Sequence, residues 1–177
     1  MTPIPAFGIW MTGLPASGKS TIVKALRPQL EACGLTVDVL ESDEVRRLLT
    51  PQATYSSEER DLFYRALAFA GQRLVAHGVT VVFDATASRQ AYRDFARAMI
   101  PRFIEVAVEC PIEVCMKRDR KGTYDKGLRG SSSTVPGLQT PYESPTNPEL
   151  RIDTTNVSAH EAAQQICDLI RERLAAA

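Results

Sequence analysis

The sequence predicts an α/β fold of three layers, in which a parallel sheet of about five strands carries helices on both faces. Short apolar, β-branched runs alternate along the chain with longer segments whose apolar residues recur at helical spacing. This strand–helix alternation is typical of a parallel sheet covered by helices. It continues through all 177 residues, so we expect a single domain, residues 1–177, large enough to bury a core.

The expected elements can be placed by residue number. The strands are expected at 7–12, 36–40, 79–83, 103–108 and 150–153. The helices are expected at 19–33, in a short stretch ending at 49, and at 57–76, 89–100, 111–119 and 158–174. Capping boxes are expected at 56–59 and 158–161. The apolar face of the helix 57–76 is expected to comprise Leu62, Ala66, Phe69, Ala70 and Leu74.

Composition excludes several classes of protein. The chain is 44% apolar and carries 21 basic and 21 acidic residues, so its formal net charge is zero. This balance argues against bulk nucleic acid or an anionic membrane as a partner. The first residues show neither a signal peptide nor a membrane span. The four cysteines are scattered, as reduced thiols of a cytoplasmic protein would be.

A phosphate-binding loop follows the first expected strand. Residues 13–20 match G-x-x-x-x-G-K-[ST] in full, and an expected helix begins there. The glycines let backbone N–H groups turn toward phosphates, and Lys19 would neutralise the β- and γ-oxygens. Ser20 would offer its hydroxyl to Mg²⁺. The pattern predicts a nucleotide site formed by Gly13, Ala16, Ser17, Gly18, Lys19, Ser20 and Thr21.

An acidic residue, Asp43, follows the second expected strand. The carboxyl ends of parallel strands line the crevice where such sheets bind ligands. The Asp43 carboxylate could therefore orient Mg²⁺ or accept a proton from an attacking hydroxyl. A structural alternative is that it caps the short helix ending at Leu49. Arg46 and Arg60 lie on helical segments expected to border the same crevice.

Residues 120–145 are rich in glycine, proline and serine and are expected to lack regular structure. A stretch of this length inside a domain is uncommon, and is either a linker or a functional lid. A linker needs a domain on each side, but only one expected strand and one helix follow it. We therefore expect a mobile lid that closes over the substrates and excludes water.

Four motifs together resemble the adenylylsulfate kinase family. They are the loop 13–21, D-x-V-R at 43–46, C-x-x-R-D-x-K-G-x-Y at 115–124 and P-Y-E-x-P at 141–145. Their order and spacing match over nearly the whole chain. The resemblance implies a P-loop NTPase fold, ATP with Mg²⁺, and transfer of the γ-phosphoryl group to the 3′-hydroxyl of adenylyl sulfate. It also implies a homodimer that binds small-molecule substrates only.

The resemblance further implies roles for single residues. Lys19, Asp43 and Lys121 are the implied catalytic residues, with Lys121 reaching over the phosphates from the lid and Ser20 and Asp43 near Mg²⁺. Arg118 lies against the adenine of ATP. Arg46 and Arg60 hold the phosphosulfate of the acceptor, and Tyr55 stacks on its adenine. The lid residue Tyr124 is also expected to contact substrate.

Four departures from the family pattern concern the acceptor. The chain has Glu41-Ser42 before Asp43 instead of D-G, Phe63 instead of an asparagine, and residues 83–88 (FDATAS) instead of an I-S-P stretch. Val135, followed by 137–139, replaces a second stacking aromatic. Phe63 and Asp84 are thus expected to reshape the acceptor site. A kinase of the same fold acting on another hydroxyl stays open, as does a nucleotide-binding regulatory subunit without turnover, against which Asp43 and Lys121 argue.

Overall fold

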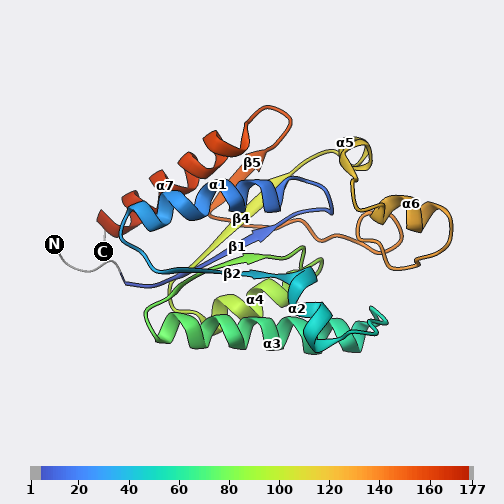
Figure 1. Cartoon of the computed structure of the whole chain (residues 1–177), viewed down its shortest axis with the longest axis horizontal. Helices are drawn as coiled ribbons and strands as arrows, with labels where there is room; N and C mark the ends of the chain where they lie inside the picture. The colour runs from blue at the N-terminus through green and yellow to red at the C-terminus, as the bar shows by residue number, and fades with distance from the viewer. Residues whose placement is uncertain (1–4, 176–177) are drawn as a thin grey trace.

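The structure, a computed structural model, describes residues 5–175 and confirms the three-layer α/β fold. Its five strands form one sheet in the order β2-β3-β1-β4-β5, with every neighbouring pair parallel (Figure 1). The strands are β1 Gly8–Thr12, β2 Val37–Glu41, β3 Thr80–Asp84, β4 Phe103–Glu109 and β5 Leu150–Asp153. The helices are α1 Lys19–Ala32, α2 Ser42–Leu49, α3 Ser57–Ala76, α4 Gln90–Met99, α5 Ile112–Arg118, α6 Thr123–Leu128 and α7 Ala159–Ala175.

Two apolar cores hold the helices on opposite faces of the sheet. Helices α1 and α7 pack on one face, and α3 and α4 on the other (Figure 1). The first core is aliphatic apart from Phe7 and Cys167, while the second contains an aromatic group in which Trp10 stacks on Phe83 with ring centroids 4.5 Å apart. Because β1 contributes to both cores, the loop that follows it is fixed from both sides.

Strand register brings distant segments of the chain to one edge of the sheet. Asp84 at the end of β3 is paired in register with Met11 of β1 and with Glu41 of β2. On the other side, Glu109 of β4 is in register with Asp153 of β5. The carboxyl ends of all five strands therefore meet at one edge, as a ligand-binding parallel sheet requires.

The prediction for the apolar face of α3 was wrong. Leu62 and Phe69 are 70% and 57% exposed, whereas the buried residues are Phe63, Tyr64, Leu67, Ala68, Gly71 and Val75. Gly71 explains which face of α3 packs against the sheet, because a Cβ at this position would lie 2.1 Å from the Phe83 ring. Both sets of residues have helical spacing, but only the second offers the gap into which Phe83 packs.

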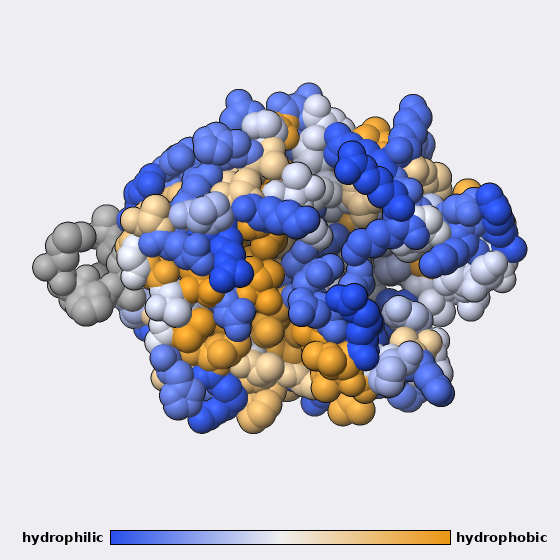
Figure 2. All heavy atoms as spheres, viewed as in Figure 1, coloured by the Kyte–Doolittle hydropathy of each residue, from blue (hydrophilic) through white to orange (hydrophobic). Residues whose placement is uncertain are grey.

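Apolar side chains also reach the surface beside α3. Figure 2 shows apolar atoms over β2 and over α2, between strongly polar helices. On α2, Leu48 and Leu49 are 80% and 55% exposed. No helix in residues 5–175 combines the length and the apolar character that crossing a membrane would need.

The two expected capping boxes differ in the structure. Before α7, the backbone N–H groups of Ser158 and Glu161 each donate to the other's side chain, at 2.9 and 3.3 Å. Before α3, only half of the box forms, with Glu59 N donating to Ser56 Oγ at 3.2 Å. The Glu59 carboxylate instead accepts from Thr54 N at 2.6 Å. Glu59 is thereby available to hold a neighbouring arginine.

The segment 120–145 has more structure than expected. It contains α6 and a small core in which Cys115, Tyr124 and Val135 are each at most 3% exposed. An isolated parallel bridge joins Pro136 and Thr140. The segment is thus a compact packed cap at the carboxyl edge, and its mobility stays a prediction.

Candidate functional site

The loop between β1 and α1 is shaped for an anion. Residues Ala16 and Gly18 have left-handed backbones, with φ of +58° and +106°. At Gly13 a Cβ would lie 2.4 Å from the Val108 carbonyl oxygen, so only glycine fits. The Ser17 hydroxyl is buried and has no hydrogen-bond partner in the described residues. A turn of this kind, opening a helix, presents backbone N–H groups to phosphate.

Lys19 lies across this loop, 7% exposed. Its ammonium donates to the carbonyl oxygens of Gly13 and Leu14 at 3.0 and 2.8 Å. Burial lowers the pKa of Lys19, and the nearby Asp84 carboxylate opposes that shift. A phosphate group in the loop would compensate the buried positive charge, which makes the loop an anion site.

Arg118 lies at the far side of the loop, where the resemblance places the adenine of ATP. It donates to the Thr154 hydroxyl at 3.1 Å and to the Thr154 carbonyl at 3.0 Å. The same hydroxyl donates to Ser17 O at 2.8 Å. Thr154 therefore connects Arg118 to the loop, a role that the sequence reasoning missed. Its position directly after β5, at the carboxyl edge, was the available signal.

Asp43 faces the lid at the opposite side of the loop. The Lys121 ammonium lies 2.6 Å from Asp43 Oδ2 and 3.5 Å from Glu41 Oε1, and the Asp43 carboxylate raises the pKa of Lys121. Asp43 does not cap α2, because the cap position is Glu41 and Asp43 lies inside the first turn. The side chains of Asp43 and Lys121 are 61% and 64% exposed. Such a pair contributes at most about 1 kcal/mol, so a substrate can separate it at little cost.

Arg46 is held in place by an aromatic and an acidic neighbour. Its guanidinium carbon lies 3.7 Å from the centroid of the Phe63 ring and 5.0 Å from that of Tyr55. Its Nη1 donates to Glu59 Oε1 at 3.2 Å. Phe63 is 2% exposed beneath it, so the ring supports the arginine. Phe63 and Glu59 thus orient Arg46.

Arg60 connects α3 to the middle of the lid. It donates to Tyr55 O at 3.0 Å and to Thr134 O of the lid at 2.7 Å. Its guanidinium carbon lies 5.5 Å from the Tyr55 ring centroid. Tyr55 has a left-handed backbone and is 41% exposed, so its ring remains accessible. Arg46, Tyr55 and Arg60 therefore form one cluster under the lid.

The segment after β3, which departs from the family pattern, is firmly held. Thr12 Oγ1 donates to Thr86 O at 2.6 Å, and Ala87 N donates to the Tyr64 hydroxyl at 3.1 Å. Arg93 donates to Ala87 O and forms an ion pair with Glu105 at 2.6 Å. Arg93 is fully buried and was not singled out from the sequence. These contacts fix the backbone that carries Asp84, which is 5% exposed.

The lid is anchored directly on the phosphate-binding loop. The Tyr124 hydroxyl donates to Pro15 O at 3.0 Å, and the ring is 1% exposed. A contact between Tyr124 and substrate therefore stays a prediction, since the ring packs under the lid. At Gly137 a Cβ would lie 2.5 Å from Leu14, so lid and loop pack closely there.

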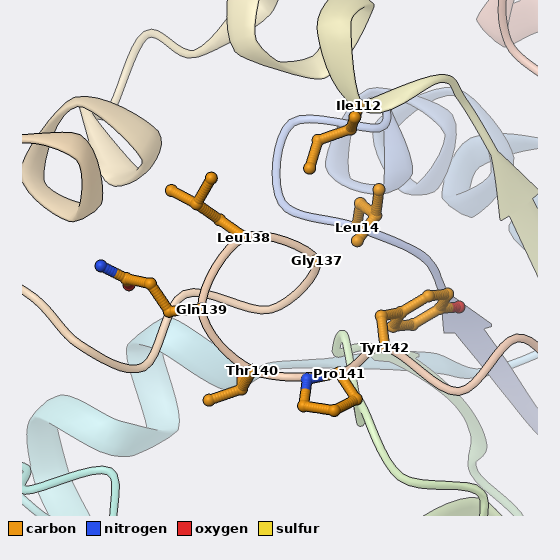
Figure 3. A pocket seen from close by; sticks show the side chains of 8 residues that line it. All are labelled: Leu14, Ile112, Gly137, Leu138, Gln139, Thr140, Pro141 and Tyr142. Atoms are coloured by element: carbon orange, nitrogen blue, oxygen red, sulfur yellow. The ribbon is translucent and has the colours of Figure 1, made fainter.

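A hollow of about 520 Å³ opens beside this anchor (Figure 3). Leu14 and Ile112 line one side of it, and the lid residues 137–142 line the other. Its lining is mostly apolar side chains and contains none of Asp43, Arg46 or Arg60. The hollow is thus separate from the cluster expected to hold the acceptor.

Comparison with known proteins agrees with this geometry. The family model described as "Adenylylsulphate kinase" matches residues 5–153. A "Probable adenylyl-sulfate kinase" of Archaeoglobus fulgidus is 42% identical over 149 residues, which is 84% of this chain and 96% of that protein. The structure of the Mycobacterium tuberculosis APS kinase CysC in complex with AMPPNP and APS aligns with a TM-score of 0.89 and 31% identity, covering 96% of this chain and 99% of that one.

An assembled relative is also similar. The hexameric APS kinase from Thiobacillus denitrificans aligns with a TM-score of 0.71 and 29% identity, over 95% of this chain and 29% of that chain. These relatives thus share the fold with this chain.

Proposed function

Because the chain belongs to the adenylylsulfate kinase family, we propose that it transfers the γ-phosphoryl group of ATP to the 3′-hydroxyl of adenylyl sulfate. The observation that carries this proposal is the meeting of Lys19, Asp43 and Lys121 at one edge of the sheet. An anion loop, a carboxylate beside a hydroxyl acceptor and a lid lysine are the groups that phosphoryl transfer requires. The relative bound to AMPPNP and APS supports the same pair of substrates.

ATP is expected to bind along the loop, with its phosphates at the N-terminus of α1. Its adenine would lie near Arg118 and Thr154, the pair that closes the far side of the loop. Gly13, Ala16, Ser17, Gly18, Ser20 and Thr21 would contact the phosphates. The buried, unpartnered hydroxyl of Ser17 supports this placement, since a phosphate oxygen would satisfy it.

The residues also fit Mg²⁺. No group of three metal-ligating side chains gathers anywhere in residues 5–175, and Mg²⁺ usually takes only one or two protein carboxylates besides phosphates and water. Ser20 and an acidic side chain near the carboxyl edge of the sheet, Asp43 on α2 or Asp84 at the end of β3, would hold it. When bound, Mg²⁺ withdraws charge from the β- and γ-phosphate oxygens.

The transfer would then proceed in one displacement. The acceptor oxygen forms a bond to the γ-phosphorus while the bond from that phosphorus to the β,γ-bridging oxygen breaks, and ADP leaves. The acceptor proton passes to the Asp43 carboxylate. Lys19 and Lys121 hold the charge on the transferring group from two sides. Lys121 must first leave Asp43, and the weak exposed pair between them permits that exchange.

The acceptor is expected to lie under the lid against the cluster on α2 and α3. Arg46 and Arg60 would hold its phosphosulfate, and the accessible ring of Tyr55 would stack on its adenine. Phe63 acts through Arg46, which lies over its ring.

One observation favours a second candidate, a kinase of this fold acting on another hydroxyl. Val135 stands where a second stacking aromatic is expected, and it is 3% exposed inside the lid core. The acceptor base would therefore contact a single aromatic face, that of Tyr55. This site would accept a smaller or different base more readily than a two-sided aromatic clamp.

We also propose that the protein forms a homodimer and is cytoplasmic. A homodimer is supported by the apolar side chains exposed on α2 and α3, while a related APS kinase is hexameric. A cytoplasmic location is supported by four free cysteines. Sedimentation analysis of the purified protein tests the first of these proposals.

An acceptor panel tests the function. Purified protein is supplied with ATP and Mg²⁺ and with adenylyl sulfate, AMP, adenosine or small polyols, and release of ADP is measured. We expect adenylyl sulfate to give the highest kcat/KM. Turnover on another acceptor without turnover on adenylyl sulfate would support the second candidate. Absence of turnover on every acceptor would support a regulatory nucleotide-binding subunit.

A further inference from the structure

A carboxylate other than Asp43 lies beside the start of α1. Asp84 ends β3, the strand that pairs with β1 just before the phosphate-binding loop. It is 5% exposed, and both Lys19 and the Ser20 hydroxyl influence its ionisation. The pairing with β1 places Asp84 beside the start of the loop, whose residues Lys19 and Ser20 are expected to contact the β- and γ-phosphates and the metal.

The Asp84 carboxylate is buried, and no cationic side chain in residues 5–175 lies within 4 Å of it as a salt-bridge partner. Burial raises the pKa of Asp84 and the charge of Lys19 opposes that shift, but the Lys19 ammonium itself donates to the carbonyl oxygens of Gly13 and Leu14. The other deeply buried carboxylate, Glu105, is met by Arg93 at 2.6 Å and Arg97 at 3.2 Å. A buried carboxylate is costly unless a cation or several donors compensate it. Asp84 thus has the surroundings of a group that receives a cation from outside the chain.

Asp43 has the opposite surroundings. Its side chain is 61% exposed and is paired with Lys121, a residue of the lid. A ligand that must order Mg²⁺ benefits from a fixed position, and Asp84 has one because the backbone after it is bound by Thr12, Tyr64 and Arg93. The position of Asp43 instead depends on an exposed helix and on the lid.

We propose that Asp84, together with Ser20, holds the Mg²⁺ that accompanies ATP, and that Asp43 is thereby left to serve the acceptor hydroxyl. The proposal rests on ATP as the donor but not on the identity of the acceptor. A carboxylate and a hydroxyl are the oxygen ligands that Mg²⁺ prefers, and phosphates and water complete its octahedron. Asp84, at the end of β3, is then a metal ligand and does not reshape the acceptor site.

Binding of Mn²⁺ to the protein–ADP complex, followed by electron paramagnetic resonance, tests the proposal without any acceptor. Asp84→Asn is expected to weaken Mn²⁺ binding at least about tenfold, while Asp43→Asn stays within about twofold of wild type. Glu44→Gln, which removes one negative charge from the exposed first turn of α2, is the matched control and is expected to bind Mn²⁺ as wild type does.

A second measurement shows that the variants are folded. ADP affinity in excess chelator, measured by calorimetry, is expected to be equal in wild type and Asp84→Asn, because the loop itself is unchanged. If Asp84→Asn does not bind ADP under these conditions, Asp84→Glu decides the question. It retains the charge but displaces the carboxylate, and its Mn²⁺ affinity is expected to be at least threefold below that of wild type.

Two results would overturn the proposal. One is that Asp84→Asn binds Mn²⁺ as tightly as wild type does. If Asp84→Asn does not bind ADP, the same result in Asp84→Glu would overturn the proposal. The other is a loss in Asp43→Asn equal to or larger than the loss in Asp84→Asn, which would place the metal on α2. A negative result in the acceptor panel would not affect the assignment of the metal to Asp84 or to Asp43, because Mn²⁺ and ADP are the only ligands used in this experiment. Absence of ADP binding by the wild type itself would contradict the proposed function and this inference together.

Discussion

The donor half and the acceptor half of the site are built differently. On the donor half, Lys19 and Ser17 are buried, and the loop that carries them is fixed by backbone geometry. On the acceptor half, Asp43 and Lys121 form an exposed pair, and Arg60 reaches across to the lid. The difference teaches that the backbone of the chain itself shapes the phosphate-binding loop, whereas the shape of the acceptor pocket depends on where the lid lies. Substitutions in the two halves should therefore fail in different ways.

The largest effect is expected for Lys19→Ala. It removes the buried positive charge that faces the β- and γ-phosphates, and transfer should fall by about 10³-fold or more. Steady-state ADP release measures it, with Lys24→Ala on the exposed side of α1 as the control. A decrease in the transfer rate of less than tenfold would show that the donor half does not depend on the Lys19 charge in the phosphate-binding loop.

Asp43→Asn should give the next largest effect. Without the carboxylate that takes the acceptor proton, kcat should fall about 10²–10⁴-fold, while ATP affinity measured by calorimetry stays unchanged. A lower kcat with unchanged ATP affinity is expected for a residue that acts on the acceptor. Unchanged turnover would remove Asp43 from the mechanism.

Arg46→Ala should weaken binding of the acceptor and leave binding of ATP unchanged. Loss of charge-assisted hydrogen bonds to the phosphosulfate should raise the KM for adenylyl sulfate by about 10–100-fold, with the KM for ATP within twofold. The neighbouring Arg47→Ala is the matched control, since Arg47 is exposed on the same helix. Equal changes in both KM values would contradict the division into two halves.

The smallest expected effect is one of stability. Burial raises the pKa of Asp84 above its ordinary value of 3.8, so the folded protein holds that proton more tightly than the unfolded chain. Stability is therefore lost as the pH rises from about 3.8 through the raised pKa. Asp84→Asn removes this loss, and without nucleotide its Tm at pH 7 should exceed wild type by about 1–3 °C. At a pH below 3.8 the two should melt alike; a lower Tm at pH 7 would show that Asp84 is already compensated.

The sequence predicted the strand, loop and helix of the donor half correctly because short-range patterns encode them. The motif at 13–21, the strand before it and the helix after it all lie within about 25 consecutive residues, so no knowledge of distant contacts was needed. The parallel sheet and the three-layer fold likewise followed from alternation, whereas the strand order came from the structure alone. Both capping positions were confirmed, although Glu59 turned its carboxylate to Thr54 and Arg46.

The rest depended on contacts between distant residues. The inner face of α3 was chosen by the fit of Phe83 against Gly71, which no periodicity reveals. The contact of Arg46 with Phe63 and the hydrogen bond from Arg93 to Ala87 O arise only when strands and helices are assembled. The small core of the lid was not predicted, because mostly polar and glycine residues separate Tyr124 from Val135 in the sequence.

The position of the transferred phosphoryl group tests the central claim most directly. Purified protein is incubated with ATP, Mg²⁺ and adenylyl sulfate, and the product is identified by phosphorus NMR and mass spectrometry. The account predicts one product, adenylyl sulfate phosphorylated on its 3′-hydroxyl, formed in equal amount to ADP. ADP released with adenylyl sulfate left unmodified, or phosphate found on another hydroxyl, would contradict it.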